Sequence, residues 1–297
     1  MQIADREIGL GNPVLIVAEL SGSHLGSLKN AHRLIDYAAD SGADSIKLQT
    51  YEPEDFTTVE APAFVDGPWK GIRPWDLYTK SQTPRDWHAE LFDHAHDKGM
   101  IAFSTPFSPD AVEFLETLGC PAYKVASLEL GYRPLLEAIA KTNKAVLLST
   151  GCQTNYVVSA ARNMISYARM HRSRNRAPCL MHCVSAYPTP IASACLAQLK
   201  SFGKRLSGLS DHSLGTLVPV LAVALGACVI EKHIKLYEDH DGPDARFAET
   251  PARFAEMVKQ VRLAEEALAA RDNTELEAPM RALRRREIDG RWLRVAP

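Results

Sequence analysis

The chain has 297 residues, enough for one large domain or two of ordinary size, and 46% of them are hydrophobic. The 34 Lys and Arg residues nearly balance the 36 Asp and Glu residues, so the net charge of -2 gives no sign of a nucleic-acid or membrane-surface partner. No apolar run approaches the roughly 18 residues of a membrane span, and the polar N-terminus is unlike a signal peptide. We therefore expect a cytoplasmic globular protein.

Strand-like and helical patterns alternate along almost the whole chain. Short continuous runs rich in Val, Ile and Leu, typical of buried parallel strands, occur at 14–20, 45–51, 100–107, 122–127, 145–150, 178–185, 206–213 and 227–234. Amphipathic helical patterns occupy 28–41, 84–98, 109–118, 134–142, 156–171, 193–202, 217–225 and 251–270. Eight such units in roughly 250 residues predict an α/β fold of the (β/α)8 TIM-barrel type. We place the catalytic barrel at residues 1–275 and a charged tail at 276–297.

Three further features concern the loops, the tail and the cysteines. The longest connection, 52–82, carries Trp69 and Trp75, and we expect it to form an ordered lid over the strand ends. In the tail, arginines cluster at 281 and 284–286, and we expect a solvated helix or a frayed end. The six cysteines show no CxxC spacing, which favours reduced and mostly buried thiols. No GxGxxG or GxxxxGK[ST] motif indicates a nucleotide site.

Two histidines end neighbouring predicted strands. His212 closes Leu-Ser-Gly-Leu-Ser-Asp-His and His233 closes Val-Ile-Glu-Lys-His, with a helical segment between the two strands. Because parallel strands joined by a helix bring their carboxyl ends to one face, the two imidazoles are a plausible half of a divalent metal site. The alternative is that each is a satisfied polar residue at a strand end. Polar neighbours such as Asp211 and Lys232 favour a bound polar ligand.

Lys47 and Lys124 lie within apolar strands, where a charge is costly unless an anion compensates it. Two such lysines predict a bound phosphate or carboxylate. For either lysine alone, an ion pair with a strand-end carboxylate such as Glu19 is an equal alternative. Strand-end hydroxyls would complete an anion cradle, and they belong to Thr105, Ser127, Ser149 and Ser210. The residues alone thus predict a metal-assisted barrel enzyme that acts on a small phosphorylated anion and a second substrate.

Ordered motifs from about residue 14 to 265 resemble the sialic acid synthase family, whose members condense phosphoenolpyruvate with an amino sugar. The matching segments include IVAELSGSHLGS (16–27), GADSIKLQTY (42–51), PAYKVASLE (121–129), HCVSAYPTP (182–190), GLSDHSLG (208–215) and LGACVIEKHI (225–234). Within the family, IKLQTY and GPWKGIRPWDLY (67–78) are more similar to pseudaminic acid synthases than to N-acetylneuraminate enzymes.

The resemblance implies a role for each matching residue. His212 and His233 would bind Mn²⁺ or Mg²⁺, and Glu19 would lie near the reacting carbons, so these three are the expected catalytic residues. The residues expected to hold phosphoenolpyruvate are Lys47, Gln49, Thr105, Lys124, Ser127, Ser149 and Ser210. Those expected near the sugar are Glu129, Tyr187 and Asp244, and Ser185 joins the substrate-binding set. The implied product is a pseudaminic-acid-type sugar acid plus phosphate, formed from an open-chain 2,4-diacetamido-2,4,6-trideoxyhexose.

Two departures from the family pattern leave alternatives open. Ser23 stands where members usually carry Asn. Members also continue into an antifreeze-like C-terminal domain that lends an arginine to the partner of a homodimer, and a chain ending at Pro297 has no room for it. Three alternatives follow: the arginine-rich tail clamps the sugar, the substrate differs from the usual ones of the family, or the domain is a separate chain. The acceptor alternatives are N-acetylmannosamine, a legionaminic acid precursor or a sugar phosphate, and a non-catalytic sugar- or partner-binding barrel is a further alternative.

Overall fold

The computed structural model describes residues 1–170, 177–203, 206–269, 284–289 and 291–295. Eight parallel strands close into a barrel in which each strand pairs with the next in sequence and the last pairs with the first. The barrel strands are β3 (Leu15–Glu19), β4 (Ser45–Thr50), β5 (Ile101–Pro106), β6 (Ala122–Val125), β7 (Ala145–Ser149), β8 (Cys179–Cys183), β9 (Ser207–Asp211) and β10 (Val229–His233). Each lies within a strand expected from the sequence, and the predicted barrel is confirmed.

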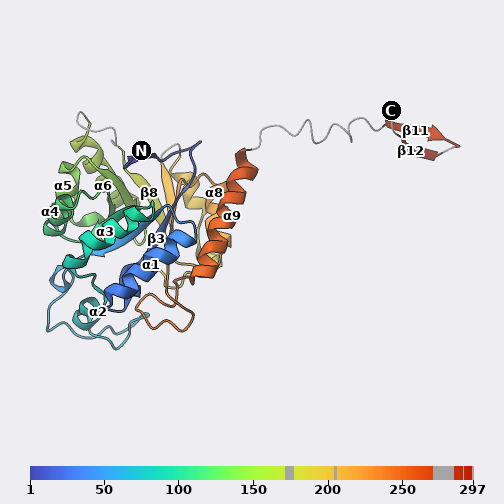
Figure 1. Cartoon of the computed structure of the whole chain (residues 1–297). Helices are drawn as coiled ribbons and strands as arrows, with labels where there is room; N and C mark the ends of the chain where they lie inside the picture. The colour runs from blue at the N-terminus through green and yellow to red at the C-terminus, as the bar shows by residue number, and fades with distance from the viewer. Residues whose placement is uncertain (171–176, 204–205, 270–283, 290, 296–297) are drawn as a thin grey trace.

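Helices cover the outside of the barrel, and a short one, Pro74–Ser81, lies at its end (Figure 1). They are α1 (Leu28–Asp40), α2 (Pro74–Ser81), α3 (His88–Asp97), α4 (Pro109–Thr117), α5 (Arg133–Lys141), α6 (Asn155–Ala168), α7 (Ala197–Ser201), α8 (Leu217–Ala224) and α9 (Pro251–Ala269). The expected helix at 84–98 begins with a 3-10 turn, η3 (Arg85–Trp87), because Pro84 holds an extended ψ of 139°. The helix expected at 193–202 is likewise shorter, since η5 (Ile191–Ser193) precedes α7.

Alternate residues along β3 belong to two different hydrophobic clusters. Ile16 packs with residues of α1 such as Leu34, whereas Leu15 and Val17 pack with Ile3 at the other side of the strand. Ile3 belongs to a small N-terminal hairpin, β1 (Gln2–Ile3) and β2 (Arg6–Glu7), that the sequence analysis did not predict. Because the side-chain period of a strand is two, the row begun by Leu15 and Val17 ends at Glu19. The apolar row therefore becomes polar at the carboxyl end of the strand.

The connection between β4 and α3 is ordered, as expected of a lid. It contains a 3-10 turn, η2 (Pro53–Asp55), and α2, and Figure 1 places it at the same end of the barrel as the loop after β10. The indole Nε1 of Trp69 donates a hydrogen bond to the carbonyl oxygen of Pro243 across 3.3 Å. The lid and the loop after β10 are thus joined directly.

The tail differs from the expectation. The described part forms an antiparallel hairpin of β11 (Arg284–Ile288) and β12 (Arg291–Val295), so the expected helix or frayed end is wrong for these residues. The Asp-Gly pair at 289–290 is a typical hairpin-turn sequence, and Asp289 has the positive φ, 50°, that such turns require. Arg281 lies outside the described residues.

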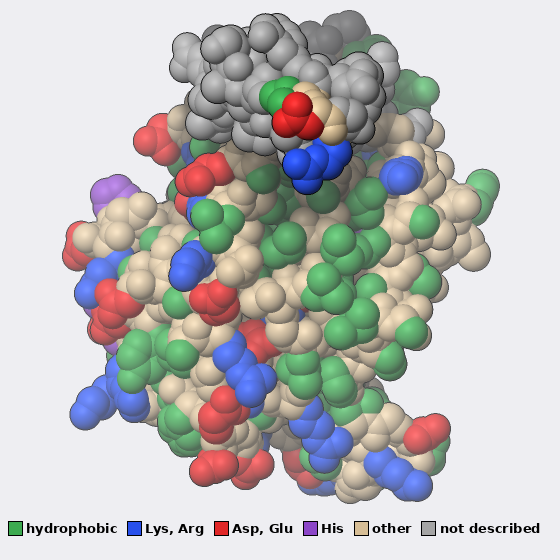
Figure 2. Space-filling view, turned by 90° about the vertical axis from the view of Figure 1, so that its right-hand side faces the viewer, with side chains coloured by type: hydrophobic (Ala, Val, Ile, Leu, Met, Phe, Trp, Pro, Cys, Tyr) green, Lys and Arg blue, Asp and Glu red, His purple; other side chains and the backbone are tan. Residues whose placement is uncertain are grey.

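Hydrophobic side chains gather on the face shown in Figure 2, the side on which Figure 1 places α8 and α9. The exposed leucines of these two helices are Leu217, Leu221, Leu263 and Leu268.

Within the described residues, no helix combines the length and the hydropathy that a membrane crossing requires.

Candidate active site

A cavity of about 470 Å³ opens at the carboxyl end of the barrel strands. Every residue to which the family resemblance gave a role in the site lines it: Glu19, Lys47, Gln49, Thr105, Lys124, Ser127, Glu129, Ser149, Ser185, Tyr187, Ser210, His212, His233 and Asp244. Because they come from seven of the strands and from loops that include the one after the eighth, β8, only closure of the barrel brings them together.

The floor of the cavity is a network of two lysines and two carboxylates. Lys47 forms an ion pair with Glu19 and donates to Thr105 Oγ1 at 3.0 Å. Lys124 Nζ lies 2.5 Å from Glu231 Oε1 and 3.0 Å from Ser210 Oγ. Each buried lysine therefore has a carboxylate partner, as the ion-pair alternative required, and both still line a cavity large enough for a ligand.

The charges of this network stabilise one another. Burial alone would raise the pKa of Glu231, but Lys124 and Lys47 outweigh it and lower that pKa. Burial would lower the pKa of Lys47, and the carboxylates of Glu19 and Glu231 raise it instead. Both groups thus stay ionised at neutral pH. Sequence reasoning gave no role to Glu231, although its carboxylate lies within 4 Å of both lysines.

Asp211 and Lys232 do not line the cavity, contrary to the expectation that these polar neighbours serve a ligand. Lys232 Nζ donates to Asp211 Oδ2 at 2.6 Å and to the carbonyl oxygen of Ser213 at 2.5 Å. Asp211 Oδ1 accepts from the backbone N–H of Ser213 at 2.9 Å. The polar atoms of this pair therefore have partners within the protein. Residues 211 and 232 alternate with the cavity-facing residues of β9 and β10, so their side chains lie on the opposite side of these strands.

His212 and His233 meet at the cavity with ring centroids 5.5 Å apart. Burial lowers the pKa of His212 to about 4 and that of His233 well below its ordinary value, so both imidazoles are neutral. His212 Nδ1 lies 3.0 Å from the carbonyl oxygen of Val184, to which it must donate, and Nε2 therefore carries the lone pair. Asp244 Oδ2 lies 3.8 Å from His233 Nδ1. In the described part of the chain, no three His, Cys, Asp or Glu side chains are arranged to hold a metal ion.

Aromatic side chains form the opposite wall of the cavity. Tyr51 contacts Phe56, Tyr78 and Phe107 with ring centroids 4.8–6.0 Å apart. Trp69 lies 6.0 Å from Tyr187 by the same measure. Sequence reasoning placed Trp69 in the lid and Tyr187 near the sugar, but it gave no role to the rings of Tyr51, Phe56, Tyr78 and Phe107. Trp75, the other tryptophan expected to cover the site, does not line the cavity.

Phe247 and the carboxyl groups of Glu129 and Asp244 also line the cavity. Phe247 packs against both His212 and His233, with centroids 5.6 and 4.8 Å away. Burial raises the pKa of Glu129, and burial together with the charge of Glu19 raises that of Asp244 to about 7. The cavity thus offers a proton-holding group, Asp244, beside the histidine pair.

Known proteins are similar to this chain in sequence and in fold. The chain is 40% identical to the pseudaminic acid synthase of Helicobacter pylori over 256 residues, which are 84% of this chain and 74% of the relative. It is 32% identical to the N,N'-diacetyllegionaminic acid synthase of Campylobacter jejuni over 86% of this chain and 77% of the relative. The structure matches the N-acetylneuraminic acid synthetase of Leptospira borgpetersenii with a TM-score of 0.82, at 30% identity and 94% coverage of both chains.

The model of the NeuB family matches residues 34–273, which include both lysines and both histidines of the cavity. The barrel and the sequence similarity therefore agree with the resemblance drawn from the motifs, and the chain belongs to the NeuB family, the sialic acid synthases.

Proposed function

We propose that this protein condenses phosphoenolpyruvate with an open-chain 2,4-diacetamido-2,4,6-trideoxyhexose to give a pseudaminic-acid-type sugar acid and phosphate. The observation that carries the proposal is that one cavity joins a lysine–hydroxyl cluster, a neutral histidine pair and an aromatic wall. The greater identity to a pseudaminic acid synthase than to a legionaminic acid synthase supports this acceptor.

Phosphoenolpyruvate would bind over the lysine cluster. Lys47 and Lys124 supply positive charge, and Ser149 Oγ is a buried hydroxyl without a hydrogen-bond partner among the described residues. A Cβ at Gly151 would lie 2.6 Å from Ser185 Oγ and 3.1 Å from Ser127 Oγ. Glycine therefore lets the end of β7 approach these hydroxyls closely, as an anion cradle requires.

His212 and His233 would hold a divalent ion, Mn²⁺ or Mg²⁺. They fit this role because neutral imidazoles are metal ligands and because the bond of His212 Nδ1 to a carbonyl fixes its tautomer. The bound ion would polarise the aldehyde oxygen of the sugar.

The remaining residues would serve the carbon chemistry. As C3 of phosphoenolpyruvate attacks the aldehyde carbon, positive charge develops at C2, and the Glu19 carboxylate stabilises it. Asp244, with its pKa of about 7, can hand a proton to the aldehyde oxygen. Water then adds at C2, and phosphate leaves by cleavage of the C–O bond. The aromatic wall favours an acceptor that presents methyl and acetamido groups rather than additional hydroxyls.

Phosphate release from phosphoenolpyruvate, measured with Mn²⁺ and a panel of amino sugars, tests the proposal. We expect the largest kcat/KM with the 2,4-diacetamido-2,4,6-trideoxyhexose of pseudaminic acid synthesis, and mass spectrometry should find the corresponding nine-carbon acid. A larger value with N-acetylmannosamine or with a legionaminic acid precursor would contradict the acceptor assignment. Absence of phosphate release with every sugar would favour a non-catalytic barrel.

A further inference from the structure

Ser21 lies two residues beyond β3, at a point where three residues of the active-site cavity meet. Its hydroxyl Oγ is 2.6 Å from Glu19 Oε1, 2.8 Å from Gln49 Nε2 and 3.4 Å from His233 Nδ1. These three residues line the cavity, whereas Ser21 is only 2% exposed and does not. One buried hydroxyl behind the cavity wall thus contacts both the proposed metal ligand and the acid expected near the reacting carbons.

The donors and acceptors around this hydroxyl determine which nitrogen of His233 carries its hydrogen. A hydroxyl has one hydrogen to donate and two lone pairs. Glu19 Oε1 takes the hydrogen, because a carboxylate can only accept, and the amide NH2 of Gln49 donates to one lone pair. Asp244 also interacts with the hydroxyl, and as a carboxylate it too would take the hydrogen. What remains for His233 is a lone pair of Ser21, so Nδ1 must be the nitrogen that donates.

This assignment leaves the lone pair of His233 on Nε2. An imidazole that binds a metal is neutral, with one N–H and one lone pair. His212 has the same tautomer, because its Nδ1 donates to the carbonyl oxygen of Val184. Asp244 Oδ2 lies 3.8 Å from His233 Nδ1, which is too far for a hydrogen bond. Ser21 therefore has the same effect on His233 as the backbone carbonyl has on His212.

The backbone of Ser21 is strained. Its φ of 40° lies in the left-handed region, which is costly for a residue with a side chain and open to glycine. Two hydrogen bonds to Glu19 Oε1 stabilise this conformation, one from the Ser21 N–H at 3.1 Å and one from Oγ at 2.6 Å. Strained residues of this kind cluster at active sites. Glycine would remove the strain, but it would also remove the hydroxyl that His233 and Gln49 contact.

We propose that Ser21 is a positioning residue of the condensation: its hydroxyl holds His233 in the tautomer that binds the metal and fixes the direction of the Glu19 carboxylate. The inference rests on the proposed function, in which His233 holds the divalent ion and Glu19 stabilises the charge at C2. Because Ser21 does not line the cavity, it acts through these two side chains and not on the substrate.

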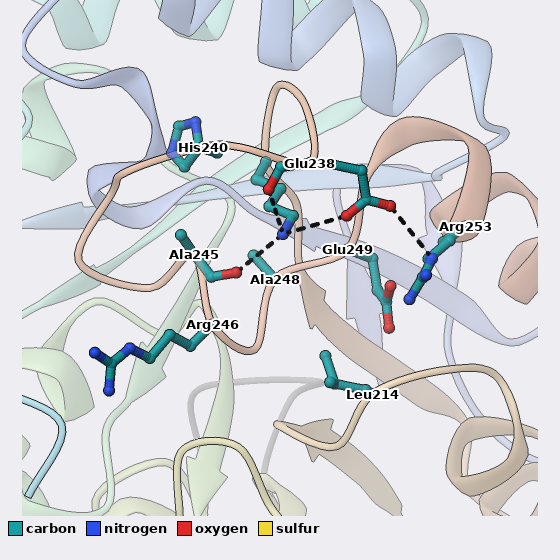
Figure 3. Close-up of a pocket in the computed structure, with 9 residues that line it drawn as sticks. Leu214, Glu238, His240, Ala245, Arg246, Ala248, Glu249 and Arg253 are labelled. Carbon is teal, nitrogen blue, oxygen red and sulfur yellow. Dashed lines mark hydrogen bonds and ion pairs between the residues drawn. The ribbon is translucent and has the colours of Figure 1, made fainter.

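The loop between β10 and α9, which also reaches His233, is held without Ser21. Figure 3 shows a smaller cavity, of about 310 Å³, beside this loop. There Lys235 Nζ donates to the carbonyl oxygens of Glu238 and Ala245 at 3.4 and 3.2 Å (Figure 3). A substitution of Ser21 should therefore leave the loop in place, and its effect on the metal would come through His233.

Ser213 provides a matched control at the end of β9. Its N–H and its Oγ both donate to Asp211 Oδ1, at 2.9 and 2.8 Å, as those of Ser21 do to Glu19. Ser213 is fully buried, and neither Ser213 nor Asp211 lines the cavity. Ser213→Ala thus removes the same kind of hydrogen bond from a carboxylate that serves no proposed ligand.

Nitrogen-15 NMR of the histidine rings in the full chain, without metal, tests the tautomer directly. In the wild type we expect His233 to carry its hydrogen on Nδ1, and its signal is assigned by its absence from His233→Gln. Ser21→Gly should show both tautomers or the hydrogen on Nε2, and Ser213→Ala should match the wild type. A wild-type His233 with its hydrogen on Nε2, or an unchanged His233 in Ser21→Gly, would overturn the proposal.

Mn²⁺ binding, followed by the electron paramagnetic resonance of the free ion, gives a second measurement without substrate. Ser21→Gly and Ser21→Ala should both weaken Mn²⁺ binding at least about tenfold, and Ser213→Ala should not. Only glycine relieves the positive φ, so Ser21→Gly should have the higher midpoint of urea denaturation. Equal loss of affinity in two variants of unequal stability would show a positioning role. An affinity that follows stability, or wild-type affinity in both variants, would overturn it.

Phosphate release separates this inference from the proposed function. In both Ser21 variants kcat should fall at least about tenfold, while the KM for phosphoenolpyruvate should change less than about threefold, because Lys124 keeps its contacts. A kcat equal to that of the wild type would refute the role of Ser21. Absence of phosphate release by the wild type with every sugar would count against the proposed function alone, since the NMR and Mn²⁺ measurements need no substrate.

Discussion

Two rows of polar side chains on β9 and β10 differ in how fully the protein satisfies them. In the row that faces away from the cavity, Lys232 bonds to Asp211 and to the carbonyl oxygen of Ser213. In the row that faces the cavity, Glu231 forms an ion pair with Lys124 of β6, but Glu231 Oε2 has no hydrogen-bond partner within the described residues. Residues of the two rows alternate along each strand, and both rows are buried.

This difference shows that a buried charge does not by itself indicate a binding site. The pair of Asp211 and Lys232 is as buried as any group in the cavity, and it needs no ligand because each polar atom already has a partner. Unsatisfied atoms beside a cavity, such as Glu231 Oε2 and Ser149 Oγ, are the better indicator. Substitutions in the two rows should therefore have different consequences, activity loss in one and stability loss in the other.

The largest expected effect concerns His233 of the cavity row. His233→Ala should reduce phosphate release on the order of a thousandfold while changing the free energy of unfolding little, because the ring faces the cavity. The matched variant is His182→Ala, since His182 is buried and bonds to the carbonyl oxygen of Ala194 at 2.7 Å. It should lower stability and retain activity per folded molecule.

Removing the metal tests the two histidines of the cavity-facing row without a substitution. Protein treated with a chelator should lose phosphate release and regain it when Mn²⁺ is added, because His212 and His233 are the proposed ligands. Full activity in excess chelator would refute the proposed metal site.

The next effect concerns the satisfied row. Lys232→Met leaves the carboxylate of Asp211 buried without its partner, which should lower the free energy of unfolding by about 3–5 kcal/mol. Urea denaturation followed by circular dichroism measures it. Adding Asp211→Asn should restore part of the loss, since the uncompensated charge is then removed. A double variant no more stable than Lys232→Met would show that lost packing, and not the unpaired charge, causes the effect.

A smaller effect is expected at the two cavity lysines, which approach Glu231 of the cavity row from β4 and β6. Lys47→Met and Lys124→Met each remove one charge-assisted contact to phosphoenolpyruvate, worth roughly 1.5–3 kcal/mol. The apparent KM for phosphoenolpyruvate should therefore rise at least about tenfold in each variant, as measured in steady-state assays. Unchanged binding of phosphoenolpyruvate by both variants would exclude the lysines from the anion site.

The barrel could be predicted from the sequence because its strands are short apolar runs and its helices begin at residues such as Pro109 and end near glycines. The site residues could be placed because barrel strands bring their carboxyl ends together. What the sequence did not reveal was which strand residues face inward, so Asp211 and Lys232 were included with the cavity row. A period of two separates the rows but does not say which one faces the cavity.

Contacts between loops were also beyond prediction. The hydrogen bond from Trp69 to Pro243 joins residues 174 positions apart, and neither loop has a periodicity that fixes its path. The hairpin of the tail was missed because its arginines obscured the alternation of polar and apolar residues around the Asp-Gly turn.

The smallest predicted effect is on the pH dependence of stability, and it concerns buried histidines whose ring nitrogens form hydrogen bonds within the protein. His24 Nδ1 accepts from the N–H of Gly26, and His88 contacts Thr50 Oγ1 at 2.9 Å. Burial lowers the pKa of each to about 4, in His24 with help from His88. The unfolded chain, with a histidine pKa near 6.5, then binds protons first as the pH falls, so stability is complete above about pH 6.5 and declines toward pH 4.

At pH 5.5 each of these two histidines should cost about 1 kcal/mol relative to pH 7.5. His88→Gln should therefore reduce the loss of unfolding free energy between pH 7.5 and 5.5, measured by urea denaturation at each pH, even if it lowers stability at pH 7.5. His96→Gln is the control, because His96 is exposed on the same helix, α3. If His88→Gln and His96→Gln keep the same pH dependence as the wild type, His88 does not remain neutral in the fold. A flatter dependence in His88→Gln alone would place His88 among the satisfied groups of the protein, together with Lys232 and Asp211.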